Sequence, residues 1–65
     1  MNGTVKFFNN KKGWGFIADE EGKEYFVHYS EIRKEGYKSL KKDQPVTFDL
    51  GSNEKGQIAV NVNPV

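Results

Sequence analysis

The stretch of sequence that decides the fold is WGFIADEEGKEYFVH, residues 14–28. Its beginning, residues 14–18, and its end, residues 24–28, are short runs rich in the aromatic and β-branched residues that are typical of strands. Between them lies DEEGK, residues 19–23, a polar segment with a glycine and the length of a hairpin connection. The stretch therefore predicts two antiparallel strands joined by a short loop.

The ring-bearing residues of these two strands alternate with smaller ones. Because residues two apart share a face of a strand, Trp14 lies on the same face as Phe16, and Phe26 on the same face as His28. Pairing of the strands then gathers four rings into one patch. The opposite face of the hairpin carries Gly15, Ile17, Tyr25 and Val27.

Three further runs of strand length are separated by turn signals: Thr4–Phe8, Pro45–Leu50 and Gln57–Val62. The polar segment between the third and fourth strands holds a predicted single helical turn over Ser30–Arg33, with Ser30 as its N-cap. No segment has a helical period over ten or more residues. We therefore expect an all-β fold, a five-stranded antiparallel sheet that curls into a barrel to protect its edges.

A small barrel has one interior, and small and branched side chains fill it best. The predicted interior residues are Gly15, Ile17, Val27, Val46, Phe48, Leu50 and Val62. The rings would then lie outside, where several large exposed rings indicate a binding surface. Periodicity does not determine which face is wet, so two alternatives stay open. The rings could instead form the core face, or the patch could be a contact with a second protein chain.

The composition narrows the function. Ten Lys and Arg against nine Asp and Glu give a net charge of +1, whereas a protein that bound nucleic acid through phosphates alone would be far more basic. Nine aromatic residues among 65 are more than so thin a core needs, and exposed rings suit the stacking of unpaired bases. An aromatic patch that docks a partner protein is the competing interpretation.

Other classes of protein fit less well. The chain has no cysteine, a single histidine and no phosphate-loop or nucleophile-elbow motif, so we expect neither an enzyme nor a cofactor or metal site. We expect one domain over residues 1–65, without a membrane partner or a small-molecule substrate. Without cysteines or a visible secretory signal, the simplest expectation is a cytoplasmic protein, which we take to be a monomer.

Motifs along the whole chain resemble those of bacterial cold-shock proteins. KGWGFI, residues 12–17, is similar to the first ribonucleoprotein motif of that family, and YFVHY, residues 25–29, is similar to the second. Further likenesses are GTVKFFN at residues 3–9, EGYKSL at 35–40 and AVNV at 59–62.

The resemblance implies an OB-type barrel that binds single-stranded RNA and DNA and acts as an ATP-independent RNA chaperone in a cold-shock or stress response. It implies that bases stack on Phe7, Trp14, Phe16, Phe26, His28, Tyr29 and Tyr37. It also implies that Lys6 and Lys12 help to hold the strand and that Lys55 reaches a phosphate.

The chain departs from the family pattern at several of these positions. Phe7 stands where the family usually has Trp, and Trp14 where it usually has Phe, so the indole has moved. Tyr29 and Tyr37 replace Phe and add hydroxyl groups. Ile58 stands where the family has Gln, so the polar contact of that position is not expected here.

Overall fold

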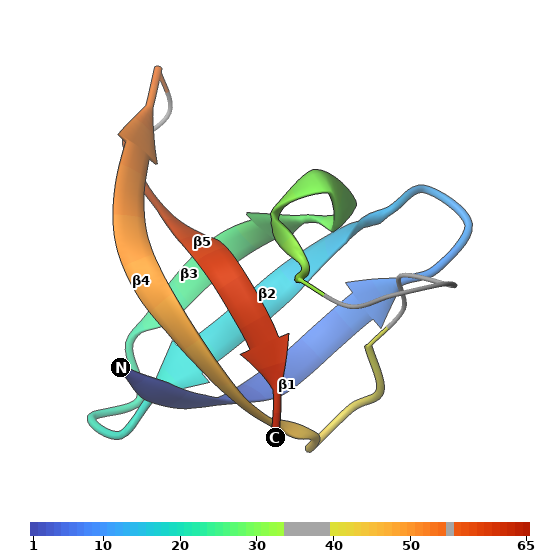
Figure 1. Cartoon of the computed structure of the whole chain (residues 1–65), viewed down its shortest axis with the longest axis horizontal. Coiled ribbons are helices and arrows are strands. Elements are labelled where there is room, and N and C mark those ends of the chain that lie inside the picture. The colour runs from blue at the N-terminus through green and yellow to red at the C-terminus, as the bar shows by residue number, and fades with distance from the viewer. Residues whose placement is uncertain (34–39, 55) are drawn as a thin grey trace.

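The computed structural model describes residues 1–33, 40–54 and 56–65, and in this part of the chain five strands close into a barrel in the order β1-β2-β3-β5-β4 (Figure 1). The elements are β1 (Asn2–Asn9), β2 (Trp14–Asp19), β3 (Glu24–His28), the 3-10 turn η1 (Tyr29–Glu31), β4 (Pro45–Asn53) and β5 (Gly56–Pro64). The predicted five-stranded barrel is confirmed. Among the described residues no helix is long and apolar enough to cross a membrane.

The strands are longer than their apolar patterns predicted, except for β3, whose bounds match. The largest extension at a single end is in β4, which continues three residues past Leu50 because its backbone pairs with β5 as far as Asn53 and Gly56. Figure 1 shows this ribbon of β4 and β5 extending beyond the rest of the barrel. Backbone pairing, which leaves no trace in the apolar pattern, sets these ends.

The sheet is antiparallel at every neighbouring pair except β3 and β5, which run parallel where Phe26 faces Ile58. This differs from an entirely antiparallel sheet for a geometric reason. In a closed ring of five strands, directions cannot alternate all the way round, so at least one neighbouring pair must be parallel. In this barrel the parallel pair is β3 and β5, which closes the ring of strands.

The core is one cluster enclosed by the barrel. Its buried members are Val5, Ile17, Tyr25, Val27, Ile32, Leu40, Val46, Phe48, Ala59 and Val62. The prediction of Gly15, Ile17, Val27, Val46, Phe48 and Val62 as interior residues is confirmed. Five core residues were not among the predicted interior set: Val5, Tyr25, Ile32, Leu40 and Ala59. For Ile32 and Leu40 no period could reveal the burial, because each is an isolated apolar residue in the long connection.

Leu50 was predicted to be in the core, and this was wrong. It is 40% exposed, whereas Phe48, two residues earlier on the same strand, is 2% exposed. The register of β4 against β5 shifts between Thr47 and Asp49, and from Asp49 onward no residue of β4 is buried. At Leu50 the strand already extends beyond the rim of the barrel. The alternation of apolar and polar residues continues there, but the apolar side chain has no core to pack against.

The predicted N-cap of the helical turn, Ser30, was wrong: the observed N-cap lies two residues earlier. The 3-10 turn begins directly after β3, and its N-cap is His28, whose side chain accepts a hydrogen bond from the backbone N–H of Ser30. Ser30 therefore lies inside the turn and does not cap it. The imidazole has an acceptor nitrogen within reach of the turn, so the last residue of the strand can serve as the cap.

We expect Val46→Ala to lower the free energy of unfolding by about 2 kcal/mol, because it removes two buried methyl groups and leaves a cavity. Leu50→Ala removes more carbon atoms from the same strand but should cost less than half as much, because Leu50 lies outside the core. Urea unfolding followed by Trp14 fluorescence compares the two variants. A larger loss for Leu50→Ala than for Val46→Ala would contradict the described boundary of the core.

Candidate nucleic-acid interface

The four rings of the central hairpin lie on its outer face. In the register of β2 against β3, Trp14 is directly opposite His28, and Phe16 is directly opposite Phe26. None of the four is buried, whereas the alternating residues Gly15, Ile17, Tyr25 and Val27 are all buried. The interpretation in which the rings form the core face is therefore excluded. We call Phe7, Trp14, Phe16, Phe26, His28 and Tyr29 the aromatic face.

Trp14 lies at the centre of the aromatic face and contacts three other rings. Its ring is stacked on Phe26 across the hairpin, with centroids 6.1 Å apart and planes inclined by 21°. It meets Phe16 edge to face at 5.9 Å, and Phe7 at 5.7 Å. Phe16 and Phe26 also meet edge to face, at 6.1 Å. Such contacts fix the rings before any ligand arrives, so little side-chain entropy remains to be lost on binding.

A β-bulge in β1 puts Phe7 on this face. The pairing with β2 runs from Val5 opposite Ile17 directly to Phe7 opposite Phe16, so Lys6 is an extra residue without a partner. Val5 points into the core, and strict alternation would have pointed Phe7 inward as well. The bulge reverses this, and Phe7 is 47% exposed. Lys6, also exposed, lies beside it.

Phe8 takes the inner position that Phe7 leaves. It lies opposite Gly15 and packs partly buried against the core cluster. A side chain at position 15 would be impossible without a shift of β1, since its Cβ would overlap the carbonyl oxygen of Phe7 and lie 2.7 Å from Cα of Phe8. Gly15 thus allows β1 to approach β2 closely enough for the rings of both strands to meet.

Tyr29 joins the aromatic face from the 3-10 turn. Its ring lies 4.5 Å from that of His28 and packs over Gly13, where an added Cβ would be 2.6 Å from Cδ1 of the tyrosine. The backbone N–H of Tyr29 donates a hydrogen bond of 2.8 Å to the carbonyl of Gly13. Gly13 has φ of +76°, which glycine adopts without strain. These contacts hold the 3-10 turn against the loop between β1 and β2.

The loop that carries Lys12 is ordered by Asn9, whose hydrogen bonds within the loop were not predicted. The side-chain oxygen of Asn9 accepts hydrogen bonds of 3.0 Å from the backbone N–H groups of Lys11 and Lys12, and its carbonyl accepts one of 2.7 Å from Gly13. An Asn before a lysine- and glycine-containing turn is the signal that would have found it. Lys12 is exposed, two residues before Trp14.

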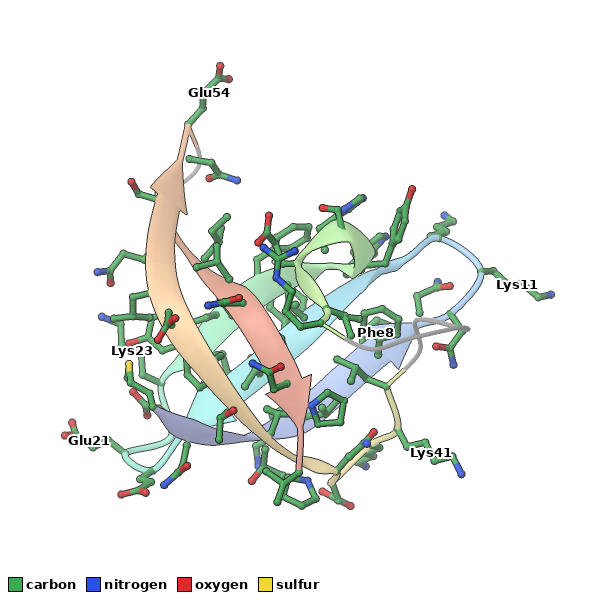
Figure 2. The ribbon with its side chains drawn as sticks, in the orientation of Figure 1. Phe8, Lys11, Glu21, Lys23, Lys41 and Glu54 are labelled. Atoms are coloured by element: carbon green, nitrogen blue, oxygen red, sulfur yellow. The ribbon has the colours of Figure 1, made fainter. Side chains whose placement is uncertain are left out.

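The charges are separated along the barrel. Figure 2 shows Lys11 at one end of the molecule and Glu21, in the turn between β2 and β3, at the opposite end. That acidic turn is closed by Asp19, which accepts hydrogen bonds of 2.9 Å from the N–H groups of Glu21 and Lys23. The ends of β2 therefore differ in charge: lysines lie in the loop before Trp14, whereas carboxylates outnumber the one lysine, Lys23, in the turn at the far end.

Eight of the ten residues predicted for the site lie in the described part of the chain. The structure brings together Phe7, Trp14, Phe16, Phe26, His28 and Tyr29. Lys6 precedes Phe7 in the bulge, and Lys12 is exposed in the loop that leads into Trp14. Tyr37 and Lys55 lie outside the described residues. Ile58 lies next to Phe26 across the parallel pair and is half-buried.

Comparison with known proteins gives a consistent result. The sequence model of the 'cold-shock' DNA-binding domain matches residues 1–65. Cold shock protein 1 of Lactiplantibacillus plantarum is 52% identical over 63 residues, which cover 97% of this chain and 96% of the relative. A cold shock-like protein of Bacillus cereus, CspB, is 50% identical over 95% of both chains. A cold shock-like protein of Thermotoga maritima is 48% identical over 100% of this chain and 98% of its own.

Two neighbouring phenylalanines test the bulge. We expect Phe8→Ala to lower the free energy of unfolding by about 2–3 kcal/mol, somewhat less than the ~3–5 kcal/mol of a fully buried ring. Phe7→Ala should cost less than about 1 kcal/mol, because its ring is largely outside the core. Thermal and urea unfolding of both variants measure the difference. Equal losses, or a larger loss for Phe7→Ala, would show that the bulge is misplaced.

Proposed function

The chain belongs to the 'cold-shock' DNA-binding domain family, and from this premise we propose that it binds single-stranded RNA and DNA by stacking their bases on the aromatic face. It is a nucleic-acid-binding domain of the cold shock protein family. The observation that supports the proposal best is the set of six rings on the outside of the barrel, four in contact around Trp14 and two, His28 and Tyr29, in contact with each other.

The energetics of stacking agree with this assignment. Each base stacked on an aromatic side chain contributes about 1–3 kcal/mol by alanine substitution. Several such contacts, less the cost of ordering the strand, correspond to dissociation constants from roughly micromolar to nanomolar. Stacking needs an unpaired base with a free π-face, so duplexes should bind poorly. Every base has such a face, so binding tolerates many sequences.

Lysines have a smaller part in the proposed complex. Lys6 and Lys12 are exposed beside the aromatic face, where each can meet a phosphate. On the resemblance to the family we also propose contacts from Tyr37 and Lys55. With a net charge of only +1, the rings should provide most of the binding energy, and the dependence of affinity on salt should be shallow.

We further propose that the protein acts as an RNA chaperone. A protein that binds only the open form of a weak RNA hairpin shifts the equilibrium toward that form by mass action, without ATP or a catalytic step. Transcription or translation through such a hairpin then meets less structure. The names of its relatives, cold shock proteins, support a role in a cold-shock or stress response. We place this activity in the cytoplasm, with a monomer of one domain as the active species.

The fluorescence of Trp14 offers a direct test of single-strand binding. A heptamer of thymidine should quench it, because a base stacked against the indole or its neighbours changes the surroundings of the ring. The same sequence in a duplex should give no quenching at equal concentration. If no single strand of RNA or DNA quenches Trp14, the proposed function is wrong, and the competing interpretation, docking of a protein on the aromatic face, is left.

Substitutions on the aromatic face should weaken binding without unfolding the protein. We expect Phe16→Ala and Phe26→Ala each to raise the dissociation constant for heptathymidine about five- to a hundredfold, the equivalent of one lost stack. Leu50→Ala is the matched control, since it removes an exposed apolar side chain outside the aromatic face. Fluorescence anisotropy of a labelled heptamer measures all three. Binding by both phenylalanine variants as tight as that of the control would refute stacking on this face.

A further inference from the structure

The hydrogen bonds of His28 determine more than the start of the 3-10 turn. Nδ1 of its imidazole lies 2.9 Å from Oγ of Ser30 and accepts a hydrogen bond of 3.3 Å from the backbone N–H of the same residue. From this contact we infer that Ser30 is a positioning residue, which holds His28 in the Nε2–H tautomer and so presents a hydrogen-bond donor to an oxygen of the bound strand. The inference rests on the proposed function and gives it a polar contact.

The tautomer follows from what each group can do. A backbone N–H only donates, so the nitrogen that accepts from it needs a free lone pair. Nδ1 of His28 is therefore unprotonated, and the ring proton of the neutral imidazole lies on Nε2. A hydroxyl can donate or accept, so the backbone contact is the one that selects the tautomer. With Nδ1 unprotonated, the hydroxyl of Ser30, whose Oγ lies 2.9 Å from that nitrogen, donates to it as well and adds to the preference.

The position of the ring leaves Nε2 available to a ligand. Nε2 lies across the imidazole from the nitrogen that the turn engages, and His28 is exposed. Within the described part of the chain Nε2 has no protein acceptor. The ring is directly opposite Trp14 and 4.5 Å from the ring of Tyr29, so the donor belongs to the aromatic face.

The group that would accept the hydrogen bond from Nε2 is an oxygen of the nucleic acid, either a phosphate oxygen or a base carbonyl. The two sources differ in what they give the protein. A phosphate contact positions the strand without regard to sequence, whereas a carbonyl contact favours thymine, uracil, cytosine or guanine over adenine, which has no carbonyl. Stacking alone supplies no such discrimination.

Ring nitrogen NMR of the protein without nucleic acid tests the tautomer, recorded under conditions in which the spectrum shows a neutral imidazole. We expect the wild type to show Nε2 protonated and Nδ1 unprotonated. Ser30→Ala should show a mixture of tautomers, because only the longer backbone contact remains, and Ser30→Thr should restore the wild-type spectrum. A protonated Nδ1 in the wild type would overturn the inference, as would a Ser30→Ala spectrum identical to it.

Binding tests the donor. His28→Phe keeps an aromatic ring but removes the N–H, so we expect the dissociation constant for heptathymidine to rise roughly two- to tenfold, the value of one neutral hydrogen bond. Ser30→Ala should show a smaller rise and Ser30→Thr none. Unfolding curves of the same variants separate a loss of the donor from a loss of stability. Unchanged affinity in His28→Phe would overturn the donor role.

A second oligonucleotide distinguishes the two oxygen sources. An equal rise for heptathymidine and for the adenine heptamer identifies a phosphate as the acceptor, and a larger rise for heptathymidine identifies a base carbonyl. The inference and the proposed function can fail separately, because the tautomer is determined without a ligand. A wild type that shows the Nε2–H tautomer but binds no single strand would refute the proposed function, and the donor role with it.

Discussion

Closure of five strands around one thin core is the constraint on which the rest of this structure depends. A barrel has a single interior, so each strand can bury only one of its faces there, and in the described part of the chain one cluster of buried side chains fills the space. On the central hairpin the buried face is taken by Gly15, Ile17, Tyr25 and Val27. The rings of the same hairpin must therefore remain outside. Exposure of so many aromatic side chains follows from topology, and the contacts among the rings reduce its cost.

The bulge at Lys6 connects this constraint to the site. With a regular β1, Phe7 would compete for the interior and Phe8 would lie in solvent. One unpaired residue exchanges them, so that the first strand contributes a ring to the outer face and still packs against the core. Because β1 pairs with both β2 and β4, the bulge has to be accommodated within the closed ring. Gly15 provides the necessary space on the neighbouring strand.

The inner and outer faces of the same strands thus have different roles: the inner face stabilises the fold, and the outer face is the proposed binding surface. The inner residues hold the barrel closed, and the outer rings are fixed by each other and by the loop and turn that Asn9, Gly13 and Tyr29 fasten together. A rigid apolar platform explains how a chain with almost no net charge can bind a polyanion in the proposed manner. The hydrogen bond proposed for His28 then adds an orientation-dependent contact to a surface that otherwise binds by stacking.

Local sequence determined much of this protein. Alternation in residues 14–28 gave the central hairpin and the two sides of it, and motifs along the chain gave the family, the barrel and the membership of Phe7 in the site. What alternation could not give was which side is wet, since a period of two is the same for either orientation. The resemblance to the family implied that the rings face outward, and the closed barrel shows it, by enclosing Val27 and leaving Phe26 outside.

The remaining differences have the same origin. Leu50 follows the pattern of a buried residue but lies beyond the rim, Ile32 and Leu40 enter the core from a segment without a period, and His28 replaces Ser30 as the cap. Each depends on what lies across from a residue in space, which the order of side chains along one strand does not record. The sequence by itself determined the strands, the pairing of the hairpin and the family. The tertiary structure alone decided the bulge, the limits of the core and the acceptor that begins the 3-10 turn, because burial and hydrogen bonding are properties of neighbours brought together by closure.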